Sequence, residues 1–295
     1  MTHPTLSQQL AGDDIVVAPG IYDAFSAASA ERAGFHSAYL SGASIAYSRF
    51  GRPDIGLVSM NEVAETVSTI RERLDLPLIV DADTGFGNAL NVQRTVRLFE
   101  RCGANALQIE DQAMPKRCGH LKGKTLVPPA EVVGKIHAAT DARLSEETLI
   151  IARTDAIAVE GFSAAMDRAE LFVEAGADVL FIEAPQDDDQ MKILTKHFKG
   201  KVPLLANMVE GGRTPMHDAA SLQALGYKLV IFPGGLVRAR ARMEQDYFAS
   251  LKSAGWNDPF KDRMLDITQL NDLLGTDQLL QDGEKYDAKN YEGSK

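Results

Sequence analysis

The amino-acid sequence predicts a (β/α)8 barrel, and three observations lead to this fold class. Short apolar runs typical of buried strands alternate with segments of helical apolar period. Glycines close several helical segments just before the next apolar run, as in "RCGANALQI" and "EAGADVLFI". The runs are apolar throughout, which is typical of a parallel sheet covered on both faces. The eight candidate strands are residues 14–20, 37–42, 76–85, 106–111, 148–156, 178–185, 203–212 and 228–235.

Eight such units fit a closed barrel better than an open, doubly wound sheet. The glycine-rich motifs of nucleotide-binding folds, G-x-G-x-x-G and G-x-x-x-x-G-K-[ST], are absent from the sequence. Proline and glycine form no linker, so residues 1–295 are expected to be one domain. Residues from about 240 to 295 are expected to be a helical extension, either a cap on the barrel or a segment that contacts a partner.

The charge balance limits the possible partners. The chain has 31 Lys and Arg against 41 Asp and Glu, a net charge of -10, which disfavours nucleic acid and anionic membranes. No apolar run approaches the roughly 18–20 residues that span a bilayer. Two cysteines and no signal-peptide pattern favour a soluble cytoplasmic protein. Any anion must therefore be bound by a local group of cations.

Polar residues follow most of the strand candidates, where a buried strand does not need them. In a barrel the carboxyl ends of the strands meet on one face, and active sites are built there. We therefore expect these side chains to converge. They are Ser41, Asp81, Asp83, Glu110, Asp111, Arg153, Asp155, Glu183, Asn207 and Glu210.

Asp81 and Asp83 are the candidate metal ligands. Two residues apart on a strand, they would point the same way, and oxygen ligands without a histidine pair favour Mg²⁺, with Mn²⁺ as the alternative. The other interpretation is that one of them caps the turn before "TGFGN". Glu110 and Glu183 either complete the metal site through water or pair with Arg153.

The stretch "AMPKRCGHLKGKTLVPP", residues 113–129, is expected to be a loop that covers the site. It carries four cations and no acid in an acidic chain, which suits carboxylate or phosphate. The cations near Cys118 would stabilise its thiolate, so the thiol could deliver a proton to a carbanion. The alternative is a solvated basic loop with an incidental cysteine.

Six motifs resemble the isocitrate lyase and phosphoenolpyruvate mutase superfamily. They are "DADTGFG" at 81–87, "QIEDQ" at 108–112, "KRCGH" at 116–120, "ARTDA" at 152–156, "IEAP" at 182–185 and "NMVEGG" at 207–212. The resemblance implies a (β/α)8 barrel, a bound Mg²⁺ and a 2-oxo acid or its precursor as ligand. It also implies a homotetramer whose C-terminal helices are swapped between subunits.

The loop cysteine is similar to that of the carbon–carbon lyases of this superfamily, and the chain length points to the short branch. That branch contains 2-methylisocitrate lyase and 2,3-dimethylmalate lyase. By resemblance the residues take three roles. The catalytic residues are Cys118, His120, Lys116 and Tyr39, with Tyr39 as the base; the substrate contacts are Ser41, Gly42, Ala43, Asp54, Gly119, Arg153, Glu183, Asn207 and Arg238; the metal residues are Asp81, Asp83 and Glu110.

The resemblance implies a lyase that splits a substituted 2-hydroxy di- or tricarboxylate into pyruvate and a carboxylic acid, succinate or propionate. Two departures bear on the substrate. The chain has Ala43 where methylisocitrate lyases carry a second glycine, and residues 266–274 hold no arginine for a third carboxylate. "NMVEGG" is similar to the dimethylmalate branch, and Arg238 to the methylisocitrate branch. The alternatives are an oxaloacetate hydrolase or decarboxylase, phosphonopyruvate chemistry and, more remotely, a non-catalytic 2-oxo-acid-binding protein.

Overall fold

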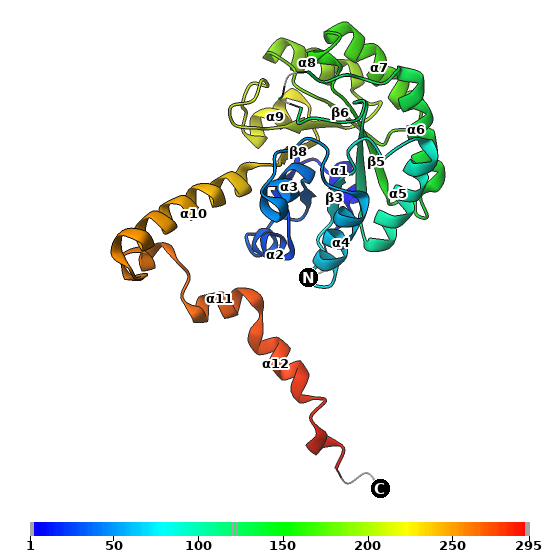
Figure 1. The fold of residues 1–295 in the computed structure, drawn as a ribbon. Coiled ribbons are helices and arrows are strands. Elements are labelled where there is room, and N and C mark those ends of the chain that lie inside the picture. The colour runs from blue at the N-terminus through cyan, green and yellow to red at the C-terminus, as the bar shows by residue number, and fades with distance from the viewer. Residues whose placement is uncertain (1–2, 120, 122, 293–295) are drawn as a thin grey trace. The chain divides into compact units, whose positions relative to one another are not determined.

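The computed structural model describes residues 3–119, 121 and 123–292, and it consists of two compact units, Met1–Arg238 and Ala239–Lys295. In the described part of the first unit, eight parallel strands close into a barrel in chain order (Figure 1). β1 pairs with β8, with Val16 opposite Leu229, and this pairing closes the sheet. The predicted fold class is confirmed. The strands are β1 (Val16–Ile21), β2 (Ala38–Leu40), β3 (Leu78–Asp81), β4 (Ala106–Glu110), β5 (Leu149–Thr154), β6 (Val179–Ile182), β7 (Leu204–Asn207) and β8 (Leu229–Phe232).

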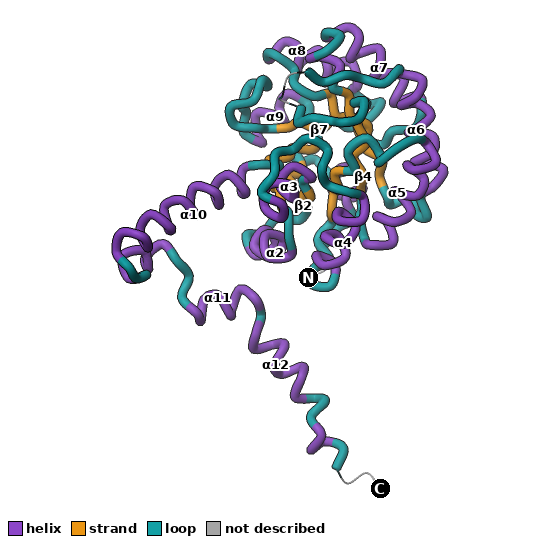
Figure 2. Tube along the Cα trace, viewed as in Figure 1, coloured by secondary structure: helices purple, strands orange, loops and turns teal. Residues whose placement is uncertain are grey.

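Helices surround the strands of the barrel unit (Figure 2). Several begin at a side chain that accepts hydrogen bonds from the first-turn amides: Asn88 Oδ1 accepts from Leu90 N and Asn91 N at 3.0 and 3.2 Å. The helices are α1 (Leu6–Ala11), α2 (Ala24–Arg32), α3 (Gly42–Phe50), α4 (Met60–Arg71), α5 (Ala89–Cys102), α6 (Pro129–Ala142), α7 (Phe162–Glu174), α8 (Asp188–Phe198), α9 (Ala219–Leu225) and α10 (Gly235–Ala254), which starts just before the boundary between the units.

Alternate side chains of the strands fill the barrel interior. Ile79, Ile151 and Phe181 belong to one buried cluster there, which also contains Leu6 and Leu10 of α1. Because these leucines share that cluster with residues at the starts of strands, α1 closes the amino-terminal end of the barrel. The opposite end is left for polar side chains.

The same alternation delivers polar groups to the carboxyl ends of the strands. A residue two positions after an inward-facing apolar residue also faces inward. The pairs are Ile79 and Asp81 on β3, Ile151 and Arg153 on β5, Phe181 on β6 with Glu183 directly after that strand, and Leu205 and Asn207 on β7. The core packing of each strand therefore fixes the direction of a polar side chain at its end.

The described part of the second unit is helical. It contains the rest of α10, followed by α11 (Ile267–Leu274) and α12 (Thr276–Glu284). Phe260 is buried against Tyr247, with ring centroids 5.5 Å apart. Many other apolar side chains of the unit are exposed, among them Trp256 at 60% and Ile267 at 73%. Across the described residues of both units, no helix has the length and apolar character needed to cross a membrane.

Candidate active site

Polar side chains at the carboxyl ends of the strands line a pocket of about 120 Å³. Gly42 and Asp83 support it from behind: Gly42 N donates to Asp81 Oδ2 at 3.3 Å, and Asp83 Oδ1 lies 2.6 Å from Lys116 Nζ. His120, expected to be catalytic, lies outside the described residues. Asp155 and Glu210, also expected at this face, are not part of the pocket lining. The residues expected to be catalytic, to contact the substrate or to bind the metal that do line it are Tyr39, Ser41, Ala43, Asp54, Asp81, Glu110, Lys116, Cys118, Gly119, Arg153, Glu183, Asn207 and Arg238.

Arg153 is buried among three carboxylates. Its Nε lies 2.9 Å from Asp155 Oδ2 and 3.3 Å from Glu110 Oε2, and its Nη2 lies 3.2 Å from Glu183 Oε2. Its guanidinium also stacks over the Phe181 ring, 4.8 Å from the centroid. Burial lowers the pKa of Arg153, but the neighbouring carboxylates outweigh it and raise that pKa well above its usual value. The guanidinium is thus permanently charged and fixed in orientation.

Lys116 occupies a second acidic cage. Its Nζ lies 2.7 Å from Asp54 Oδ1 and 2.6 Å from Asp83 Oδ1. Burial lowers the pKa of Lys116, yet Asp83, Asp81 and Asp54 together raise it well above the ordinary value. Lys116 is therefore an ammonium ion, and it ties the loop to the end of β3.

The acids expected to hold a metal are buried, and one oxygen of Glu110 accepts no hydrogen bond from the described residues. Burial raises the pKa of Asp83 to about 7, against the opposing effect of Lys116, and burial also raises the pKa of Glu110 well above its usual value. Among the described residues, Glu110 Oε1 is buried and accepts no hydrogen bond. A cation would relieve both costs, so this donor set suits Mg²⁺.

The described residues contain no group of three or more His, Cys, Asp and Glu side chains placed to hold a metal ion together. Mg²⁺ is usually held by one or two carboxylates and keeps several waters, so it does not require such a group. β3 ends at Asp81, and Asp83 has a φ of 47°, so the two acids do not share a strand as the sequence predicted.

Tyr39 is held as a neutral hydrogen-bond donor. Its hydroxyl donates to Gln108 Oε1 at 2.8 Å, and Gln108 Nε2 donates to Asp81 Oδ1 at 3.3 Å. Burial and then the charge of Asp81 raise the pKa of Tyr39 well above its usual value. A tyrosine acts as a general base only as its phenolate, which a raised pKa disfavours, so the expectation that Tyr39 is the base does not fit its surroundings. Its contact instead orients Gln108 and, through it, Asp81.

The loop segment that carries Cys118 lies directly on the site. Cys118 is half-buried, and its backbone N donates to Asp54 O at 3.3 Å. A Cβ on Gly119 would collide with Arg153 Nη2 and lie 2.9 Å from Glu183 Oε2, so only glycine fits there. Gln112 fixes the start of the loop: its Nε2 donates to Arg117 O at 2.8 Å, and its Oε1 accepts from Arg117 N at 3.0 Å.

Arg238 lies at the rim of the pocket, where its guanidinium is already paired with Glu210. Its Nη1 donates to Glu210 O at 2.9 Å, and its Nη2 forms an ion pair with the Glu210 carboxylate. Its Nε donates to Gly234 O at 3.0 Å. Because both side chains are exposed, solvent screens this pair and a substrate could compete for it.

One strand-end acid faces away from the pocket. Asp111 accepts from Thr154 Oγ1 at 2.7 Å and from Asp155 N at 2.9 Å, and Arg168 Nη1 lies 3.4 Å from it. It follows Glu110, so alternation turns it outward, and its expected place in the site is wrong. Sequence reasoning also missed Gln108, although a glutamine at an inward position of an apolar strand was a usable signal.

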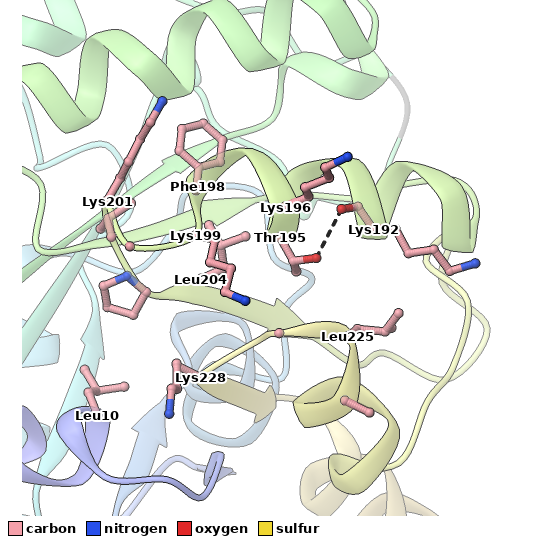
Figure 3. A pocket seen from close by; sticks show the side chains of 15 residues that line it. Leu10, Lys192, Thr195, Lys196, Phe198, Lys199, Lys201, Leu204, Leu225 and Lys228 are labelled. Carbon is pink, nitrogen blue, oxygen red and sulfur yellow. Dashed lines mark hydrogen bonds between the residues drawn. The ribbon is translucent and has the colours of Figure 1, made fainter.

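A larger hollow of about 880 Å³ lies near the starts of β7 and β8 (Figure 3). Leu10, Phe198 and Leu204 supply apolar surface, and the lining also contains Lys192, Lys196, Lys199, Lys201 and Lys228. The described residues that line it include no acid, thiol or histidine. It therefore offers no carboxylate or thiol for the chemistry of the smaller pocket, which combines carboxylates, buried cations and a thiol and remains the candidate active site.

Comparisons with known proteins agree with this geometry. The sequence profile of the phosphoenolpyruvate phosphomutase family matches residues 6–252. The chain is 47% identical over 276 residues to 2-methylisocitrate lyase of Aeropyrum pernix, covering 94% of this chain and 87% of that protein. It is 41% identical over 278 residues to 2,3-dimethylmalate lyase of Eubacterium barkeri, covering 94% and 96%.

Solved structures of related enzymes have the same fold. A crystal structure of 2,3-dimethylmalate lyase has a TM-score of 0.90 and 34% identity, covering 99% of this chain and 98% of the other. Phosphonopyruvate hydrolase in complex with oxalate and Mg²⁺ has a TM-score of 0.85 and 31% identity, covering 95% and 97%. The chain therefore belongs to the phosphoenolpyruvate mutase and isocitrate lyase superfamily, and it is a carbon–carbon lyase.

Proposed function

We propose that the protein cleaves the C2–C3 bond of a substituted 2-hydroxy dicarboxylate of the 2,3-dimethylmalate type, giving pyruvate and propionate. The observation that carries this proposal is the meeting of Arg153, Asp81 and Cys118 in one pocket. An anchor for a carboxylate, a candidate metal ligand and a candidate proton donor are the parts that such a cleavage needs. The similarity to 2,3-dimethylmalate lyase over nearly the whole chain supports it.

The 2-oxo half of the substrate would lie against β2 and β5. Arg153 offers a fixed guanidinium for its carboxylate, and the first-turn amide of α3 at Ala43 suits a carboxylate or carbonyl oxygen, while Gly42 N is taken by Asp81. Asp81 and Asp83, with Glu110 behind them, would hold Mg²⁺, or Mn²⁺ in its place. When bound, the cation would offset the negative charge of the 2-hydroxy acid and hold its oxygens.

In the proposed reaction the hydroxyl proton passes to a carboxylate of the pocket, the C2–C3 bond breaks, and C2 becomes the carbonyl carbon of pyruvate. The bonding electrons stay on C3 as a carbanion next to the second carboxylate. The Cys118 thiol then gives its proton to C3, which yields propionate. Lys116 and Arg153 lie in a largely dry site, where their charge stabilises the developing anion more than in water.

A third carboxylate would need a cation that is not already engaged. Glu210 is paired with Arg238 at the rim, and Lys116 and Arg153 are caged by acids. The pocket of about 120 Å³ also suits the smaller acid. The competing substrate is 2-methylisocitrate. Arg238 favours this acid, because the arginine lines the pocket and could exchange Glu210 for a substrate carboxylate.

The choice between the two substrates is tested by giving the enzyme 2,3-dimethylmalate or 2-methylisocitrate with Mg²⁺ and measuring pyruvate release. We expect kcat/KM for 2,3-dimethylmalate to exceed that for 2-methylisocitrate by about tenfold, because an uncompensated carboxylate costs on the order of 1–3 kcal/mol. Glu210→Gln should narrow the ratio by releasing Arg238. A higher kcat/KM for 2-methylisocitrate would reverse the assignment. If neither acid releases pyruvate and the enzyme turns over oxaloacetate or phosphonopyruvate, that activity would replace the proposed one.

Replacing Cys118 by serine should lower kcat by about 10²–10⁴-fold, because the alcohol is a much weaker acid than the thiol. Binding of oxalate with Mg²⁺, measured by calorimetry, should stay within a few-fold of wild type. Cys102→Ser is the matched control, since Cys102 is half-buried at the end of α5 and should leave kcat unchanged. Full turnover by the Cys118→Ser enzyme would exclude the thiol as the acid.

We propose further that the protein is a homotetramer that exchanges its C-terminal helices between subunits. Support comes from the exposed apolar side chains of the second unit, such as Leu279 and Leu280 at 62% and 63%. Light scattering coupled to gel filtration should give four times the chain mass of 32.0 kDa. Leu280→Asp should shift this mass downward. A wild-type protein that is monomeric at every concentration would refute the tetramer.

A further inference from the structure

We propose that Lys124 is a positioning residue for the cleavage: it holds the backbone at Gly119, and so the Cys118 thiol, in register with Arg153. Lys124 does not line the pocket, and the mechanism above gives it no role. The inference rests on the proposed function, because it assigns Lys124 to the step in which Cys118 gives up its proton. The following contacts carry it.

Lys124 is a buried lysine inside a surface loop. It is only 8% exposed, and its Nζ donates to the carbonyl oxygen of Gly119 and lies 2.6 Å from Asp155 Oδ1. Lysine is almost never buried unless its charge is paired. A lysine in a loop would ordinarily be exposed, so the burial of Lys124 depends on these two contacts. The two contacts join the loop to the end of β5.

Asp155 connects Lys124 to the substrate-binding arginine. Its side chain is fully buried, and it accepts from Arg153 Nε at 2.9 Å and from Arg153 Nη2 at 3.2 Å. Burial raises the pKa of Asp155, but Arg153 and Lys124 outweigh that effect and lower it. The carboxylate is therefore ionised between two cations, and both hold it in place.

Gly119 completes the connection. It packs so closely on Arg153 Nη2 and Glu183 Oε2 that no side chain fits there. Its carbonyl is held by Lys124, and the preceding residue is Cys118, whose backbone N donates to Asp54 O. The peptide around the thiol is thus fixed on one side by Asp54 and on the other by Lys124. Loss of the Lys124 ammonium would release the second side and leave a buried carbonyl without its donor.

The position of the thiol matters more for proton delivery than for substrate binding. A general acid must lie within hydrogen-bond reach of the carbon it protonates, whereas the substrate carboxylate is anchored by Arg153, which keeps three carboxylate partners. Removal of Lys124 should therefore lower kcat and leave KM nearly unchanged. A lysine needed only for folding would not separate the two constants.

The test compares Lys124→Met and Lys124→Arg with Lys228→Met, in full-length enzyme with Mg²⁺. Lys228 is a matched control, because its Nζ donates to Gly12 O at 2.6 Å but it lies in the hollow of Figure 3, away from the pocket. We expect Lys124→Met to lower kcat by about 10- to 100-fold with KM within threefold. Lys124→Arg should recover most of the loss, and Lys228→Met should behave as wild type.

A second readout does not depend on turnover. In a Cys102→Ser background, the rate of alkylation of Cys118 by iodoacetamide should rise at least threefold in Lys124→Met and stay at the wild-type value in Lys228→Met. If Lys124→Met does not fold, Lys124→Gln takes its place, since its shorter, uncharged side chain removes the ammonium from both Gly119 O and Asp155.

The proposal is overturned if the Lys124 variant matches Lys228→Met in kcat and alkylation rate, or if KM rises while kcat holds. The failure of the proposed function is separate. A wild-type enzyme that releases no 2-oxo acid from any hydroxy acid rejects that function, whereas the alkylation rates still decide whether Lys124 positions Cys118.

Discussion

The burial of Arg153 among Asp155, Glu110 and Glu183 is the interaction on which the rest of the site depends. A guanidinium removed from water is costly unless carboxylates surround it, and removal of one partner from such a group is strongly destabilising. The carboxylates come from the ends of β4, β5 and β6, so the barrel must bring three strands together before the charge is compensated. The cage in turn fixes Gly119, and with it the loop that carries Cys118.

Lys116 repeats this arrangement, because it lies between Asp54 and Asp83, two acids from different segments. On the proposed function, the ion pairs that allow charges to be buried also place the groups that react. The same pairs would let a pocket rich in acids bind an acidic substrate, because its acids are engaged by resident cations or are suited to Mg²⁺.

The fold followed from the sequence because burial on both faces leaves a simple pattern. The apolar runs located all eight strands, and the rule that the carboxyl ends of barrel strands meet on one face predicted that Asp81, Arg153, Glu183 and Asn207 lie together, as they do in one pocket. The sequence prediction did not apply strand alternation to neighbouring acids at the end of one strand. It separates Glu110, which faces the pocket, from Asp111, which faces Thr154 and Arg168.

Other features depend on contacts that no local pattern reveals. The link of Lys124 to Asp155 joins residues 31 positions apart, and the Tyr39 hydroxyl meets Gln108 across 69 positions. The environment of Tyr39, and hence its unsuitability as a base, is a property of the packed barrel. Likewise, β3 ends at Asp81 and Asp83 turns into a positive φ, which the motif "DADTG" alone did not indicate.

The central claim is that one pocket holds a divalent cation at Asp81 and Asp83 beside an anion anchored on Arg153. Mn²⁺ binding followed by electron paramagnetic resonance, with and without oxalate, tests it most directly. We expect one Mn²⁺ per chain, tighter binding with oxalate, and affinity lowered at least about tenfold by Asp81→Asn. Asp178→Asn, which alters an acid paired with Arg143 instead, should bind as wild type. Unchanged Mn²⁺ binding by Asp81→Asn, or no effect of oxalate, would contradict the account.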